Sequence, residues 1–206
     1  PGMAGGGNGQ AFYYDLAYDH FLHQLPDGSY VGGLAEKWGW AEPGNKVFDV
    51  TLREGVKFSD GSDLTAEAAK ASFEYLKNAG AMPAGDVERF ESIEVTGPLS
   101  LRFTLKDANP QLELYFSNSK PVAAIISPEG LKNPDKLGTE TFGTGPYKLD
   151  PSKTVAGQTY VYVPNEYYHT PKDQHWKTVT IQVMPDPTTA LNAMLAGQVD
   201  FMFGRA

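Results

Sequence analysis

Residues 52–61 read LREGVKFSDG, and this stretch decides how the surrounding chain is interpreted. The run Val47–Leu52 that leads into it alternates apolar and polar side chains, which is the pattern of a half-buried strand. Gly55 permits a turn, and Phe58 then returns an apolar side chain to the core. Gly61, with the aspartate before it, reverses the chain again. The stretch therefore predicts a strand that leads through two reversals into the next element.

That next element is predicted to be a helix from Thr65 to about Asn78. The Thr65 hydroxyl can accept a hydrogen bond from an otherwise unpaired N–H of the first turn. Farther along, alternation in Phe90–Val95 and Leu99–Leu105 predicts an antiparallel hairpin. The short apolar run Val122–Ile126 predicts a buried strand.

Both ends of the chain carry weaker patterns. Ala11–Gln24 has apolar and aromatic side chains at approximately helical spacing and predicts a first helix. Near the other end, an aspartate–proline pair predicts the start of a helix, since aspartate suits the N-cap and proline the first helical position. The order strand, helix, strand there predicts a right-handed βαβ unit with a parallel end to the sheet. These C-terminal elements are Thr159–Val163, Val179–Val183, a helix from Asp186-Pro187 to Gly197, and Val199–Phe203.

Composition excludes several classes of function. The chain has 206 residues, 25 acidic and 17 basic side chains, no cysteine and 41% hydrophobic residues. That apolar share can bury a core, and no apolar run approaches the roughly 18 residues needed to span a bilayer. The acidic balance argues against nucleic acid as a partner. The lack of cysteine excludes a thiol nucleophile and a cysteine zinc site. The sequence shows no signal peptide, so we expect any targeting segment to lie outside it.

No pattern identifies a catalytic, metal or cofactor site. The motifs GxSxG, HExxH and GxxxxGK[ST] are absent. His20 and His23 are three residues apart on the predicted first helix and could share a face, but solvated or hydrogen-bonded histidines are the favoured interpretation. The aromatic side chains crowded between Phe12 and Trp40 favour a core over a binding cleft. Gly5–Gly9 suits either a flexible end or backbone laid close to a ligand.

Several phrases in order and spacing resemble one family, the family-five extracellular solute-binding proteins. These are the peptide-, dipeptide- and nickel-type receptors of ABC importers. The most specific phrase is LREGVKFSDG at 52–61, and GTGPYKL at 143–149 is the second. The others are YDHFL at 18–22, PDG at 26–28, GLAEKW at 33–38, LTAE at 64–67, NEYY at 165–168 and GQVD at 197–200.

The resemblance implies an α/β, periplasmic-binding-protein-like fold of class II, the peptide-binding type. We expect a partial fold with mixed sheets in two lobes. Residues 1–32 would form the N-terminal segment of the first lobe, 33–142 a small inserted lobe, and 143–206 the return to the first lobe. Family members are considerably longer, so the resemblance also implies that a second large lobe is missing from this sequence.

Ligand contacts are implied by the resemblance at two places, the segment before the first helix and the strand end after the GQVD phrase. They match the family by spacing and not by identity. Arg205 could bind a carboxylate through its forked guanidinium, or be an ordinary solvated arginine. The ligand-binding residues expected here are Gly6, Gly7, Asn8, Phe203, Gly204 and Arg205.

The function implied by the resemblance is the substrate-binding component of an ABC importer. It would capture a peptide or other small solute and deliver it to a permease, as a monomer, in the periplasm or at the cell surface, with a lipid anchor as one option. No enzyme activity, cofactor, metal or nucleic-acid partner is expected. Two alternatives remain open at this point: a glycan-acting hydrolase with paired carboxylates, and an effector-sensing module of a regulator.

Overall fold

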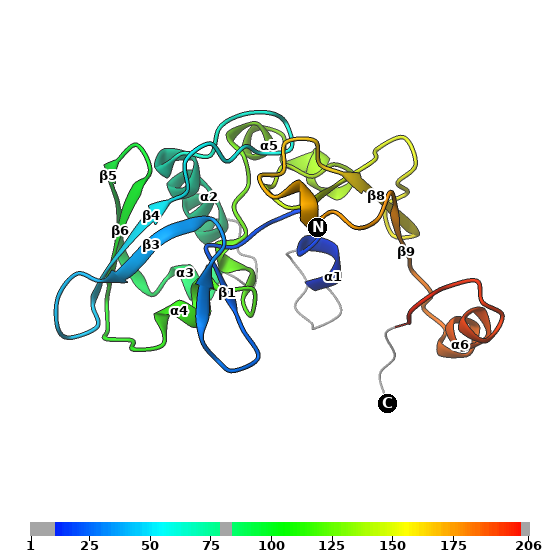
Figure 1. The fold of residues 1–206 in the computed structure, drawn as a ribbon, viewed down its shortest axis with the longest axis horizontal. Helices are drawn as coiled ribbons and strands as arrows, with labels where there is room; N and C mark the ends of the chain where they lie inside the picture. The colour runs from blue at the N-terminus through cyan, green and yellow to red at the C-terminus, as the bar shows by residue number, and fades with distance from the viewer. Residues whose placement is uncertain (1–10, 79–83, 203–206) are drawn as a thin grey trace.

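The computed structural model describes residues 11–78 and 84–202. A four-stranded sheet with its helix lies at one end of the molecule and a three-stranded sheet lies toward the other (Figure 1). A two-stranded hairpin and a short N-terminal helix lie between them, and the last helix extends away from the body. This arrangement confirms the predicted α/β class. The boundaries of the lobes stay a prediction.

The four-stranded sheet contains the strand that leads into residues 52–61. Its strands are β3 (Ala35–Trp40), β4 (Val47–Leu52), β5 (Phe90–Gly97) and β6 (Ser100–Leu105), in the order β3-β4-β6-β5 and antiparallel throughout. The predicted strand and hairpin are therefore confirmed. Gly55 and Gly61 have φ angles of 77° and 86°, so both predicted reversals use the left-handed conformation that glycine tolerates.

Helix α2 (Ala66–Asn78) packs on this sheet and begins as predicted. The Ala68 N–H donates to Thr65 Oγ1 at 3.1 Å, which satisfies one of the orphan donors of the first turn. The short helix α3 (Ala84–Val87) follows. The buried face of α2 carries Phe73 and Leu76, which enter the core between helix and sheet.

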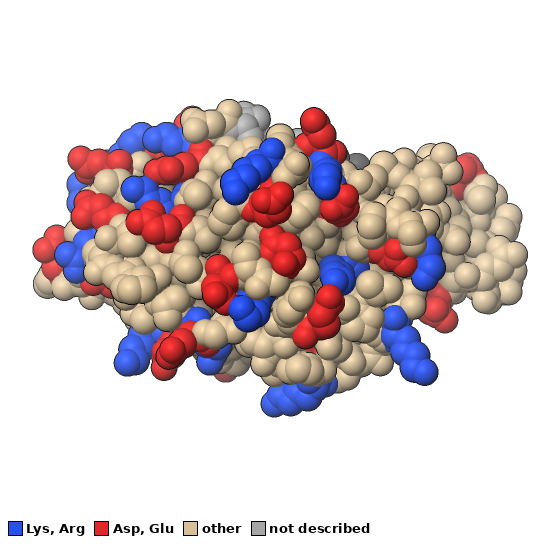
Figure 2. Space-filling model, turned by 90° about the horizontal axis from the view of Figure 1, so that it is seen from above, with Lys and Arg blue, Asp and Glu red and all other residues tan. Residues whose placement is uncertain are grey.

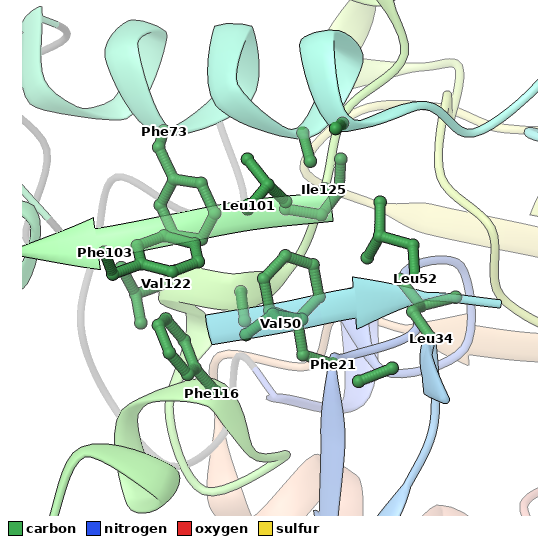
Figure 3. Close-up of a cluster of buried hydrophobic side chains, with 14 of the residues drawn as sticks. Phe21, Leu34, Val50, Leu52, Phe73, Leu101, Phe103, Phe116, Val122 and Ile125 are labelled. Carbon is green, nitrogen blue, oxygen red and sulfur yellow. The ribbon is translucent and has the colours of Figure 1, made fainter. Parts of the chain in front are cut away.

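Phenylalanine side chains dominate this first core. Phe103 on β6 lies 5.4 Å from Phe73 and 4.7 Å from Phe116 of helix α4 (Leu112–Phe116), measured between ring centroids. Figure 3 shows these rings enclosed by Phe21 and by aliphatic side chains from both layers. Phe103 is fully buried. Burial of such rings, at about 25 cal/mol per Å² of apolar surface, is the main stabilising contribution here.

The predicted first helix is wrong beyond its first turn. Helix α1 covers only Ala11–Tyr14, and the chain then bends into a hairpin of β1 (Leu22–Gln24) and β2 (Tyr30–Gly32). The buried aromatic side chains of residues 11–24 pack into two separate cores and do not form one helix face. Tyr18 belongs to the second core, whereas Phe21 belongs to the first. Tertiary packing therefore overrides the local helical spacing.

The apolar run 122–126 is buried as predicted, but it is not a strand. It begins in a 3-10 turn, η2 (Pro121–Ala123), and continues as extended chain without a ladder partner among the described residues. Side chains take the place of a sheet neighbour, because the Ile126 N–H donates to Ser72 Oγ at 3.0 Å. Helix α5 (Pro128–Lys132) and the 3-10 helix η3 (Pro134–Gly138) follow.

The second sheet consists of β7 (Tyr147–Leu149), β8 (Thr159–Pro164) and β9 (Val179–Gln182). The 3-10 helix η4 (Pro171–Asp173) lies between β8 and β9. Both strand pairs are antiparallel, which confirms the two predicted strands but contradicts the parallel end expected for the sheet. The three sheets that the described residues form are therefore antiparallel, and the expectation of mixed strand directions in them is wrong.

Helix α6 (Pro187–Leu195) confirms the predicted aspartate cap. Asp186 Oδ1 accepts a hydrogen bond from the Thr189 N–H at 2.7 Å, and proline occupies the first turn. No strand forms over residues 199–202, so the predicted βαβ unit is absent from the described residues. The physical reason is position: α6 lies away from the second sheet in Figure 1, and among the described strands β9 pairs with β8 alone.

Lys and Arg alternate with Asp and Glu over most of the face in Figure 2, while its right-hand end, where α6 lies, is nearly free of charge. The exposed apolar side chains of α6 include Leu191, Met194 and Leu195. Among the described residues, the helices are too short or too polar for any of them to traverse a bilayer.

Candidate functional site

The six residues predicted to contact a ligand, Gly6, Gly7, Asn8, Phe203, Gly204 and Arg205, lie outside the described residues. Their described neighbours meet in space. Phe12 is four positions after Asn8, and Phe201 is two positions before Phe203. The rings of Phe12 and Phe201 lie 6.0 Å apart, so the two chain segments approach each other although 188 residues separate these rings in sequence.

An aromatic wall surrounds this meeting point and consists of Phe12, Tyr13, Tyr160 and Phe201. Phe12 and Phe201 are 44% and 69% exposed. Tyr13 packs edge-on against Tyr160 at 5.1 Å, and its carbonyl accepts a hydrogen bond from the Tyr162 hydroxyl at 2.7 Å. β8 therefore fixes α1 in place. The crowded aromatics in the sequence indicated Phe12 and Tyr13, but no local pattern indicated Tyr160 or Phe201.

A separate polar pocket opens between the β1–β2 hairpin, the turn after β4 and the loop after β8. It encloses about 570 Å³. No sequence pattern indicates this pocket, because its walls come from three segments far apart in the chain. The charged and titratable residues that line it are Asp19, His23, Arg53, Glu54, Tyr168, His169 and Asp173.

Asp19 is the buried centre of the polar pocket, with 5% of its side chain exposed. Its Oδ1 lies 2.9 Å from His23 Nε2 and accepts the His20 backbone N–H at 2.8 Å. His169 Nε2 approaches Oδ2 only to 4.0 Å. The hydrogen bond to Asp19 raises the pKa of His23, whereas burial lowers the pKa of His169.

His20 is not among the residues that line the polar pocket, and it is 2% exposed. The predicted shared helix face with His23 is wrong, because no helix covers these residues. Burial lowers the pKa of His20 to about 4. Its Nε2 has no hydrogen-bond partner and lies 4.0 Å from Asp15 Oδ1. Burial raises the pKa of that carboxyl to about 6.

This burial predicts a loss of stability in acid that is specific to His20. The folded state holds the imidazole neutral down to about pH 4, whereas the unfolded chain protonates near 6.5. The contribution is complete above pH 6.5 and is lost as pH falls to about 4, and it amounts to roughly 3 kcal/mol. Urea unfolding at pH 7 and pH 4.5 should show the variant His20→Gln losing less stability on acidification than the original chain.

Comparing the original chain with His20→Gln at both pH values controls for the other titrating groups. Asp15 and His23 have raised pKa values and titrate in the opposite sense, but both are present in the two proteins. Equal losses of stability in the original chain and in His20→Gln would contradict the burial argument.

The described residues contain no group of three or more His, Asp or Glu side chains arranged to hold a metal ion. The carboxylate at the centre of the polar pocket is already bonded to an imidazole. The polar pocket therefore offers hydrogen-bonding and charged groups, while the exposed aromatic surface lies elsewhere.

Solved structures with this fold define the class. The murein tripeptide-binding protein of Escherichia coli superposes with a TM-score of 0.83 over 97% of this chain and 42% of that one, at 18% identity. At such identity the likeness shows the fold alone. The described residues therefore have the fold of part of that protein.

The particular family follows from the sequence match. The family model of bacterial extracellular solute-binding proteins, family 5, middle part, matches residues 29–206, and the chain belongs to this family. The expectation from the sequence phrases is thereby confirmed.

Two relatives are similar in sequence as well. The nickel-binding periplasmic protein of Escherichia coli K12 is 32% identical over 202 residues, which are 95% of this chain and 37% of the relative. NikA from Brucella suis, solved in complex with Fe(III)-EDTA, is also 32% identical, with a TM-score of 0.77 over 92% of this chain and 38% of that one. The chain therefore spans less than half of the relatives it matches.

Proposed function

We propose that this chain is part of the substrate-binding component of an ABC importer, which captures peptides or similar small solutes outside the membrane and delivers them to a permease. The observation that carries the proposal is the contact between Phe12 and Phe201. It supports the predicted convergence of the N-terminal segment and the strand end at one ligand site. Relatives named for binding peptides, nickel and glutathione support the same class.

The aromatic wall would form one side of this site. Aromatic faces bury a large area while losing few rotamers, so they suit a surface that must hold varied solutes. Both phenylalanines are exposed enough to meet a ligand. Enclosure by a second lobe would complete the site and supply the remaining buried area.

Substitutions in the wall test the proposal. In the full-length protein, Phe12→Ala and Phe201→Ala should each weaken binding of the transported solute by roughly tenfold, because each removes a contact face of about 1 kcal/mol or more. Calorimetry against a library of di- and tripeptides provides the measurement. Trp176→Ala is the matched control, since Trp176 is 59% exposed and lies outside the wall. Unchanged affinity in both phenylalanine variants would refute the assignment.

The proposal includes location, assembly and chemistry. The protein is exported to the periplasm or the cell surface, with a lipid anchor as one form, and works as a monomer. It is not an enzyme and uses no cofactor. The relative named a periplasmic protein supports the location. Cell fractionation tests it, since recovery in the cytoplasm alone would contradict export.

A further inference from the structure

The polar pocket exposes one carboxylate oxygen of Asp19 that no donor of the described residues occupies. Asp19 Oδ1 has two partners, His23 Nε2 and the His20 N–H. Within the described part of the chain, Oδ2 has no donor at hydrogen-bonding distance, and its nearest charged neighbour is His169 Nε2 at 4.0 Å. A carboxylate that is 95% buried requires hydrogen-bond donors to offset the loss of its hydration. Oδ2 is therefore open to accept a hydrogen bond from a molecule in the pocket.

Arg53 shows the opposite need in the same pocket. Its Nε donates to the Gly33 carbonyl at 3.2 Å, which holds the guanidinium at the edge of the polar pocket. Among the residues in 11–78 and 84–202, no carboxylate forms an ion pair with it within 4.0 Å. The remaining N–H donors of a fixed guanidinium fit a carboxylate in a forked geometry.

We propose that the polar pocket binds a small zwitterion, with its ammonium on Asp19 and its carboxylate on Arg53. A volume of about 570 Å³ accommodates an amino acid or an ω-amino acid together with water. Glu54 and Asp173 line the pocket as further acids and favour an ammonium over a neutral donor.

The position of the pocket gives such a ligand a structural consequence. Arg53 lies in the turn that ends β4 of the first sheet, Asp19 precedes β1, and His169 belongs to the loop between β8 and β9. A bound zwitterion would therefore link the four-stranded sheet to the loop of the second sheet. None of these residues belongs to the segments predicted to hold the transported solute, so the inference goes beyond the proposed function.

Three probes with the same carbon chain test the charge requirement: 4-aminobutyrate, butylamine and butyrate. Titration of the full chain, followed by NMR of the histidine ring signals, measures each affinity. We expect 4-aminobutyrate to bind about tenfold more tightly than either single-charge probe, because only it satisfies both groups. Equal affinities for the three probes, or no saturable shift with 4-aminobutyrate, would overturn the proposal.

A pair of arginine variants locates the binding. Arg53→Gln should weaken 4-aminobutyrate by about tenfold and leave butylamine unchanged, since only the carboxylate contact is lost. Arg102→Gln is the matched control on β6, where Arg102 pairs with Asp49 outside the pocket. Equal losses in both variants, or none in Arg53→Gln, would show that the pocket is not the site.

The exposed acid Asp173 gives a second test should Arg53→Gln fail to fold. Asp173→Asn should weaken butylamine and 4-aminobutyrate but not butyrate, and any loss confined to butyrate would contradict the assigned orientation. The transported solute is absent from all these titrations. Failure of the zwitterion site and failure of the proposed function are therefore separate outcomes.

Discussion

Phe103→Ala should lower the free energy of unfolding by about 3–5 kcal/mol, the largest effect expected from a single core substitution in this chain. Phe103 is fully buried and meets Phe21, Phe73, Phe90 and Phe116 at centroid distances of 4.7 to 6.3 Å. Truncation removes one ring from a group packed against sheet and helix, and the neighbouring rings are too rigid to fill the space.

Urea unfolding monitored by circular dichroism measures this loss. Leu195→Ala is a suitable control because Leu195 is 76% exposed, and we expect its effect to stay within about 0.5 kcal/mol. If Phe103→Ala costs less than about 1 kcal/mol, the phenylalanine core does not hold the four-stranded sheet to α2.

Gly145→Ala should also be strongly destabilising, by about 1–3 kcal/mol or more. A Cβ at this position would lie 2.5 Å from Ala17 C and 2.7 Å from Tyr18 N, which are backbone atoms that cannot rotate away. The Gly145 N–H donates to Ala17 O at 2.9 Å, so the two segments could separate only by losing that bond. The close approach joins the N-terminal segment to the chain that enters β7.

Gly39→Ala is the matched control, since a Cβ on Gly39 would meet no atom within 4 Å. Thermal or chemical unfolding of both variants provides the comparison. Similar stabilities for Gly145→Ala and Gly39→Ala would show that the junction tolerates a side chain.

The sequence predicts correctly the helices and strands whose caps or alternation lie within a few residues of the element. Thr65 caps α2 and Asp186 caps α6 through the oxygens that the sequence indicated. β4 and β6 keep one face buried, as their alternation requires. Caps and alternation act over a few residues, and distant packing seldom reverses them.

The predictions from local pattern are wrong or silent where the structure depends on contacts between distant segments. Their spacing predicts that Tyr18 and Phe21 share a helix face, but the two side chains pack in different cores. The sequence predicts a strand over Val199–Phe203 that completes a parallel unit, but no strand forms over its described part, 199–202. The polar pocket combines Asp19, Arg53 and His169 from three segments, and no spacing in a single sequence encodes such a meeting.

The fate of a solute after binding distinguishes a receptor from an enzyme. A peptide that saturates the full-length protein in calorimetry is recovered by denaturing the complex and is then weighed by mass spectrometry. We expect one peptide per protein, returned with its mass unchanged. Recovery of a cleaved or modified peptide at a rate above the protein-free control would contradict a receptor that binds and releases its solute intact.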